Sequence, residues 1–81
     1  MKQNYEHHIV ITTKYHGPTN SNGSRITASY DGRRVTKSYD HALNSTGNHE
    51  AAALAFIAKH FPEYSIRAYG AIDTGYVFLV R

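Results

Sequence analysis

Alternating apolar and polar residues predict three strands in the first half of the chain. His8–Tyr15, rich in β-branched and aromatic residues, is typical of a strand. Arg25–Tyr30 and Arg33–Tyr39 alternate in the same way on either side of Asp31-Gly32. Asp-Gly between two such runs is a strong hairpin signal, because both central residues of a type I′ turn need positive φ. Residues 16–24 between the first two runs are turn formers and predict a loop.

A two-residue Asp31-Gly32 turn would also determine the register of this hairpin. Tyr30 then faces Arg33, and the pairing runs on to Arg25 opposite Ser38. One face of the hairpin would be apolar and would carry Ile26, Ala28 and Val35. The other face would be wholly polar and would carry Arg25, Thr27, Ser29, Arg34, Thr36 and Ser38.

A helix is expected after a second loop, Asp40–Thr46. Thr46 or Asn48 would cap it, and Glu50 would lie in its first turn, where the helix dipole favours an acid. Pro62 would end it. Apolar residues at i, i+3, i+4 and i+7 predict the stripe that packs on the sheet: Leu54, Ile57, Ala58 and Phe61.

The remaining residues predict a closing hairpin and complete the fold class. Ser65–Ile72 and Gly75–Val80 are expected to pair around Asp73-Thr74-Gly75. We therefore expect an α+β fold of order β-β-β-α-β-β, in which one helix packs on one face of a four- to five-stranded antiparallel sheet. The 81 residues make a single domain, 1–81, with residues 1–6 as a flexible lead-in.

Composition adds a weak indication about partners. The chain has no cysteine and a net charge of +3, and its longest apolar run of eight residues, Ala51–Ala58, is far below the roughly 20 needed to span a bilayer. The N-terminus has no apolar segment after Lys2, so we expect no signal peptide and a cytoplasmic location. From Lys14 to Lys37, five basic residues stand against one acid, which favours an acidic partner such as a phosphate backbone.

Six histidines raise the question of a metal site, and their spacing argues against one. His7 and His8 would point to opposite faces of a strand, and His49 and His60 would lie more than about 16 Å apart on a helix. The motifs of serine hydrolases, P-loop proteins and dinucleotide-binding enzymes are missing. We expect no metal, no cofactor and no enzymatic activity.

Two surfaces are candidates for binding a partner. If the closing hairpin keeps the same phase as the first, the polar sheet face gains Arg67, Tyr69, Tyr76 and Phe78. Their neighbours would then take the core side: Ile66, Ala68, Val77 and Leu79. Arginines beside exposed aromatic rings can hold phosphates and stack bases. The alternative is a solvated outer face, the default for a sheet covered on one side.

The second candidate surface is on the helix. Phe56 projects away from the predicted stripe, beside Ala52, Lys59 and His60, so it could anchor a homodimer or a larger partner. The alternative is an exposed phenylalanine without a role.

Four segments resemble small uncharacterised proteins of bacteriophages, prophages and plasmids: Lys14–Asn20, Gly23–Ala28, Tyr39–Asn44 and Asn48–Ala53. The resemblance covers roughly residues 12–60 and implies no established activity, and the chain departs from it after Ser65. It draws attention to Lys14, Thr19 and Asn20 as partner-binding residues. In a functional version the Thr19–Arg25 loop would meet the Asp40–Asn48 loop at one end of the sheet, around Arg25. A purely local role is the alternative, since Gly17, Pro18 and Gly23 suit a turn.

By size and suspected origin the chain is also similar to anti-CRISPR proteins, a class defined by role. The leading hypothesis is therefore a non-enzymatic phage or mobile-element accessory protein. It would bind and inhibit or modulate a CRISPR-type defence nuclease complex, or its nucleic acid, in the bacterial cytoplasm. The alternative is a stand-alone nucleic-acid-binding domain that uses a basic, aromatic sheet face.

Overall fold

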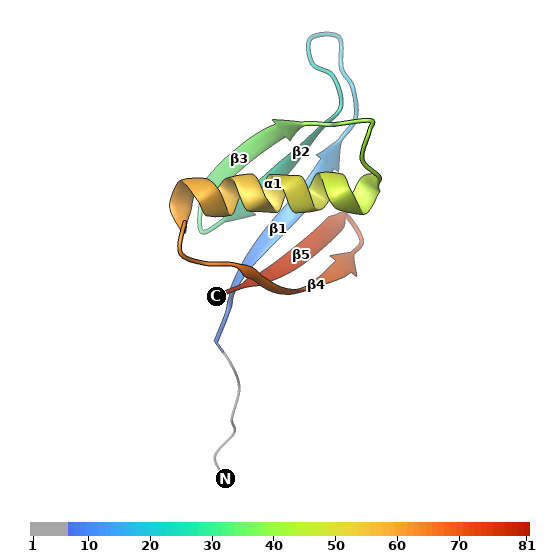
Figure 1. The fold of residues 1–81 in the computed structure, drawn as a ribbon. Coiled ribbons are helices and arrows are strands. Elements are labelled where there is room, and N and C mark those ends of the chain that lie inside the picture. Colours follow the sequence, from blue (N-terminus) through green and yellow to red (C-terminus); the bar gives the residue numbers. More distant parts are fainter. Residues whose placement is uncertain (1–6) are drawn as a thin grey trace.

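The computed structural model describes residues 7–81, so the expected lead-in of residues 1–6 lies outside the described residues. One helix lies across one face of a five-stranded antiparallel sheet, in the strand order β3-β2-β1-β5-β4 (Figure 1). The predicted α+β class and element order are confirmed. The elements are β1 (Ile9–His16), β2 (Arg25–Tyr30), β3 (Arg33–Ser38), α1 (Ser45–His60), β4 (Ile66–Ile72) and β5 (Gly75–Val80).

The β2–β3 hairpin has the predicted register. Tyr30 pairs with Arg33 and the ladder continues to Arg25 opposite Ser38. Asp31 and Gly32 have φ of 52° and 77°, the two positive values that a type I′ turn needs. The polar face of this hairpin therefore points away from α1, because Ile26 and Ala28 on the other face are buried.

The helix begins earlier than expected. Asn44 is the N-cap, and its Oδ1 accepts a hydrogen bond from the backbone N–H of Gly47 at 2.7 Å. The predicted caps Thr46 and Asn48 lie inside the helix, and Glu50 lies beyond its first turn, so these predictions were wrong. All three errors have one cause, since the cap was placed two or four residues too late.

The buried face of α1 also differs from the predicted stripe. Six residues face the sheet: Asn48, His49, Ala52, Ala53, Phe56 and Ile57. Leu54 is 50% exposed and Ala58 is exposed, so only Ile57 and Phe61 of the predicted stripe contact the core. The stripe was wrong because two polar residues, Asn48 and His49, occupy the buried face and rotate it away from Leu54.

From Ala68 onward the closing hairpin has the opposite phase to the one expected, whereas Ile66 packs against the core as predicted. Ile11 of β1 pairs with Phe78, and Ile9 pairs with Val80. Phe78 and Val80 are both buried on the face of the sheet that α1 covers. Val77 therefore faces away from α1. The phase was mispredicted because Tyr76–Val80 is apolar throughout, so alternation cannot specify its buried face and pairing with β1 decides it.

Strand β4 is irregular at Arg67. Ile66 pairs with Val80 and Ala68 with its neighbour Leu79, so Arg67 is the extra residue of a β-bulge. The helix packs chiefly on β1, β2 and β3, which leaves β4 at an edge of the sheet beyond it (Figure 1).

Candidate functional site

Three strands present a continuous polar surface on the side of the sheet opposite α1. Registers between β1, β2 and β3 align its side chains in three rows across the strands. We call this surface the basic face; its rows are His16–Arg25–Ser38, Lys14–Thr27–Thr36 and Thr12–Ser29–Arg34.

Within residues 7–81 the basic face carries positive charge, and its three rows contain no acid. None of the five strands of the described chain contains an aspartate or glutamate. Lys14, Arg25 and Arg34 form no ion pair within residues 7–81. Because ion pairs do not neutralise these side chains, they are available to an anion from outside.

The pKa of His16 is affected by this charge. Its Nε2 lies 3.0 Å from Oγ1 of Thr27 in the neighbouring row. Burial lowers the pKa of His16 below its usual 6.5, and the charges of Arg25, Lys14 and Arg34 lower it further. The imidazole is therefore mostly neutral at pH 7, and Lys14, Arg25 and Arg34 carry the charge of the basic face.

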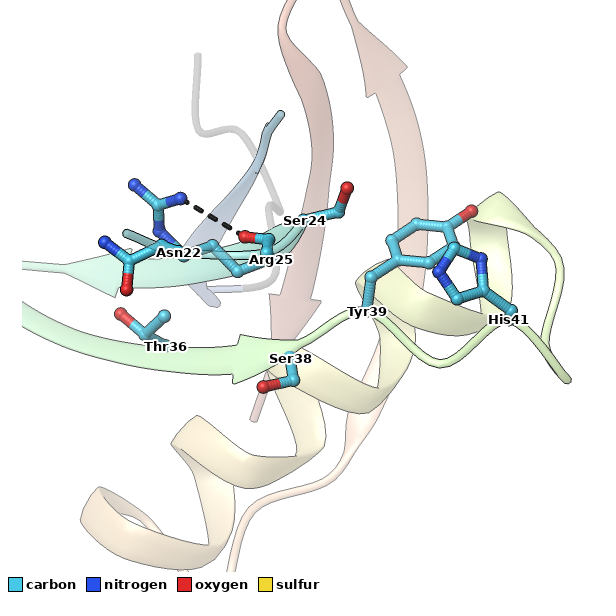
Figure 2. A pocket seen from close by; sticks show the side chains of 8 residues that line it. Asn22, Ser24, Arg25, Thr36, Ser38, Tyr39 and His41 are labelled. Atoms are coloured by element: carbon cyan, nitrogen blue, oxygen red, sulfur yellow. Dashed lines mark hydrogen bonds between the residues drawn. The ribbon is translucent and has the colours of Figure 1, made fainter. Parts of the chain in front are cut away.

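A shallow pocket of about 400 Å³ lies where β2 begins and β3 ends (Figure 2). The Arg25 side chain enters it, and its Nη1 donates to the carbonyl of Gly23 at 3.5 Å, long for a hydrogen bond. The pocket lining contains no carboxylate and consists of Asn22, Gly23, Ser24, Arg25, Thr36, Ser38, Tyr39 and His41.

The two sides of this pocket are held together. The backbone N–H of Tyr39 donates to the carbonyl of Ser24 at 3.0 Å. The Tyr15 hydroxyl donates to the Ser24 hydroxyl at 3.0 Å, and the Tyr15 ring packs edge-on against Tyr39 with centroids 5.7 Å apart. Residues of both loops line the pocket with Arg25, namely Asn22–Ser24 on one side and His41 on the other, and a binding role for this meeting stays a prediction.

The loop between β1 and β2 projects beyond the sheet (Figure 1). Thr19 forms a turn within it, since its Oγ1 accepts from the backbone N–H of Asn22 at 3.0 Å and its own N–H donates to the Asn22 carbonyl at 2.7 Å. Asn20 is exposed. The local role of Thr19 is thus explained, while a binding role for Thr19 and Asn20 stays a prediction.

The aromatic residues predicted for the basic face lie on the other side of the sheet. Tyr69 stacks on Phe78 with centroids 5.8 Å apart, and the Tyr76 hydroxyl lies 2.9 Å from Oγ1 of Thr46 in α1. Their phase follows from the β1–β5 register, which turns Phe78 into the core. The predicted basic and aromatic face was therefore wrong in its aromatic half.

Two further predicted site residues are also displaced. Arg67 lies on the β4 bulge, at the edge of the sheet farthest from β3, and its Nε donates to the carbonyl of Arg81 at 3.3 Å. Phe56 is fully buried in the core. A homodimer anchored by Phe56 is therefore wrong, because this ring points into the sheet and not to solvent.

Sequence reasoning missed some residues of the site. His16 belongs to the basic face because it pairs with Arg25, which only the β1–β2 register reveals. Tyr39 and His41 reach the pocket because their segment turns back toward Ser24. The spacing of Lys14 and His16 at i and i+2 on a strand was the one local signal for part of this set.

The described part of the chain contains neither a metal-binding cluster nor a membrane-spanning helix. In residues 7–81, no three histidine, cysteine, aspartate or glutamate side chains come together as a group that could hold a metal ion. No helix in this range is long and apolar enough to cross a membrane.

Comparisons with protein-family models, with curated proteins and with solved structures found no match to this chain. The site is therefore interpreted from its own residues.

Proposed function

We propose that this chain is a non-catalytic binding domain whose basic face takes the phosphate backbone of a nucleic acid. The observation that carries the proposal is a set of three cations, Lys14, Arg25 and Arg34, which form no ion pair within residues 7–81 and share an open sheet face whose three rows contain no carboxylate. Hydroxyl groups of serine and threonine lie between these cations and can donate hydrogen bonds to phosphate oxygens.

The spacing of the cations suits a short stretch of backbone. With strands about 4.8 Å apart and a rise of about 3.4 Å per residue, the registers place their Cα atoms about 8 to 14 Å from one another. Three phosphate contacts correspond to a slope of roughly −2 in log affinity against log salt for a single strand. A fourfold rise in salt would then weaken binding about 16-fold.

The basic face is expected to contact the backbone and not the bases. Its three rows contain no tyrosine or phenylalanine on which a base could stack. Binding without base contacts carries little sequence information, so we expect a weak sequence preference.

A defence complex as the target is a narrower form of the same proposal. The RNA of a nucleoprotein complex presents the same phosphates as free RNA, so the basic face could bind it there and modulate the complex. Support for this form comes from the resemblance of residues 12–60 to phage and plasmid proteins.

Fluorescence anisotropy with labelled 12-nucleotide DNA and RNA tests the proposal. At 50 mM and 200 mM salt the affinity should differ by about 16-fold, and Lys14→Glu with Arg34→Glu should abolish binding. The matched control is Lys37→Glu with Lys59→Glu, which makes the same change in net charge at exposed positions off the basic face. Absence of binding, or equal loss in both double variants, would contradict the proposal.

The narrower form has its own measurement. The chain would be used to capture its target from a bacterial lysate that contains a CRISPR-type complex. Recovery of the complex by the natural chain and not by the Lys14→Glu, Arg34→Glu variant would favour a defence target. Recovery by neither, with anisotropy intact, would leave the stand-alone nucleic-acid-binding domain.

A further inference from the structure

The pocket at Arg25 differs from the rest of the basic face because it is hollow and has two unlike ends. Asn22, Arg25 and Thr36 gather at one end, and the rings of Tyr39 and His41 lie at the other (Figure 2). A flat face with cations spread over three rows suits a continuous backbone, whereas a pocket with a polar end and an aromatic end suits one nucleotide. We propose that it binds a nucleotide phosphomonoester, namely the phosphorylated end of a nucleic-acid strand.

This inference rests on the proposed function, because the phosphorylated end belongs to the nucleic-acid strand that is bound on the basic face. Arg25 belongs both to the pocket and to a row of the basic face. A nucleic-acid strand that crosses the basic face toward the start of β2 therefore reaches the pocket. The loop Asn22–Ser24 and the segment from Tyr39 to His41 flank it there, so the chain of phosphates would end in the pocket.

Several hydrogen-bond donors at the polar end of the pocket have no acceptor within residues 7–81. The side chains of Asn22, Thr36 and Ser38 form no hydrogen bond within residues 7–81. In the same residues the guanidinium of Arg25 forms one hydrogen bond, the long one to the Gly23 carbonyl. An arginine fork, two hydroxyls and an amide thus face a space that a group with several acceptor oxygens can fill.

Charge favours a monoester over a diester at this position. A phosphate monoester carries about −1.5 to −2 at pH 7 and has three free oxygens, whereas a diester carries about −1. The pocket lining contains one full cation, Arg25, and no carboxylate to repel the second charge. A terminal phosphate therefore gains more here than an internal one.

The aromatic end can hold the sugar and base of the same nucleotide. Tyr39 is half-buried and fixed by its edge-on contact with Tyr15, and the exposed His41 ring lies 5.2 Å from it. Planar rings at the wall of a pocket are the surfaces on which terminal, unpaired bases settle.

The test compares one 12-nucleotide strand in three forms: with a 5′-phosphate, with a 3′-phosphate and with neither. We expect one phosphorylated form to bind at least about tenfold more tightly than the unphosphorylated strand, the gain of one charge-assisted hydrogen bond. Arg25→Gln should reduce this advantage to less than about twofold, while the matched control Lys37→Gln should retain it.

A second variant tests the same site in case Arg25→Gln does not fold. Ser38 is exposed on the edge strand β3 and pairs with Arg25, so Ser38→Asp places a carboxylate beside the guanidinium. It should remove the same advantage without removing the arginine. An advantage that survives both folded variants would overturn the assignment of the pocket.

The remaining outcomes separate this inference from the proposed function. If all three strands bind equally and with steep salt dependence, the pocket assignment fails and the basic face stands. If adenosine monophosphate alone binds as tightly as the phosphorylated strand, the ligand is a free nucleotide and the strand end is overturned. If no strand and no mononucleotide binds, both fail.

Discussion

Nδ1 of His49 lies 2.7 Å from Oγ1 of Thr13, which joins the helix to the central strand across 36 positions of sequence. Both side chains are buried, at 3% and 0% exposure. The Thr13 hydroxyl also donates to the carbonyl of Tyr76 at 3.3 Å, and the Tyr76 ring packs on the imidazole with centroids 4.8 Å apart. This polar contact lies within the apolar core and determines which face of α1 meets the sheet.

The fold should lose stability in mild acid because of His49. Burial lowers the pKa of His49 below 6.5, so the native state favours the neutral ring and the unfolded chain takes up the proton first. Its contribution is complete above pH 6.5 and is lost as the pH falls through the lower pKa of the folded state. Melting temperatures at pH 7.5, 6 and 5 should therefore decrease in that order.

His49→Gln is the control for this effect. The variant should melt lower than the natural chain at pH 7.5, yet its melting temperature should depend less on pH. Part of the dependence should remain, because the pKa values of His16 and His60 are also lowered. An unchanged pH dependence in the variant would show that His49 does not titrate in this way.

Phe56 should be a main source of core stability. It is fully buried, and Phe56→Ala should lower the free energy of unfolding by about 3–5 kcal/mol. Leu54→Ala, two residues earlier on the exposed side of the helix, should change it by no more than about 0.5 kcal/mol. Urea unfolding measures both, and a larger loss at Leu54 would contradict the orientation of α1.

Gly75 should tolerate no side chain, whereas Gly70 should. A Cβ at position 75 would collide with the backbone carbonyl of Thr13 and approach Cε1 of His49 to 3.2 Å. A Cβ at position 70 meets nothing within 4 Å. Gly75→Ala should therefore unfold or strongly destabilise the domain, and Gly70→Ala should be neutral or slightly stabilising. Circular dichroism melts of the pair would reveal the difference.

Asn48 should matter more than the cap residue Asn44. Its Oδ1 accepts from the backbone N–H of Asp40 at 2.7 Å, and its Nδ2 donates to the carbonyls of Asp40, Leu43 and Asn44. Asn44→Ala removes one cap bond and should cost about 1 kcal/mol. Asn48→Ala removes four part-buried hydrogen bonds at once, so its unfolding free energy should fall further. The reverse order in urea unfolding would contradict this.

The hairpin was predictable to the residue because its information is local. Asp31-Gly32 dictates the turn, and alternation on both sides then places Arg25 and Arg34 on the outer face. Neither step needs any knowledge of the rest of the chain. The predicted part of the candidate site is the part that this hairpin carries.

The errors arose where distant partners decide the structure. The face of α1 depends on the contact of His49 with Thr13, and the phase of β5 depends on the pairing of Phe78 with Ile11. The periodicity of apolar residues along the sequence indicates neither of these long-range contacts. Tyr69 was consequently placed on the wrong side of the sheet.

The pocket was only partly foreseeable. The Gly and Asn residues around Ser24 indicated a loop near Arg25, and the resemblance pointed to the same loop. The inclusion of Tyr39 follows from its backbone bond to Ser24, which joins two segments that sequence alone leaves separate. Loops are placed by such single contacts, and sequence patterns do not encode them.

The bulge in β4 has a consequence for how copies of this chain behave at high concentration. An outer strand is a template for backbone pairing with another molecule, which is the first step toward fibrils. On one side of the sheet Arg67 interrupts the ladder and its side chain returns to the carbonyl of Arg81. On the other side β3 displays Arg33, Arg34 and Lys37, whose charges repel a second copy. Both ends of the sheet are thus protected against polymerisation, one by geometry and the other by charge.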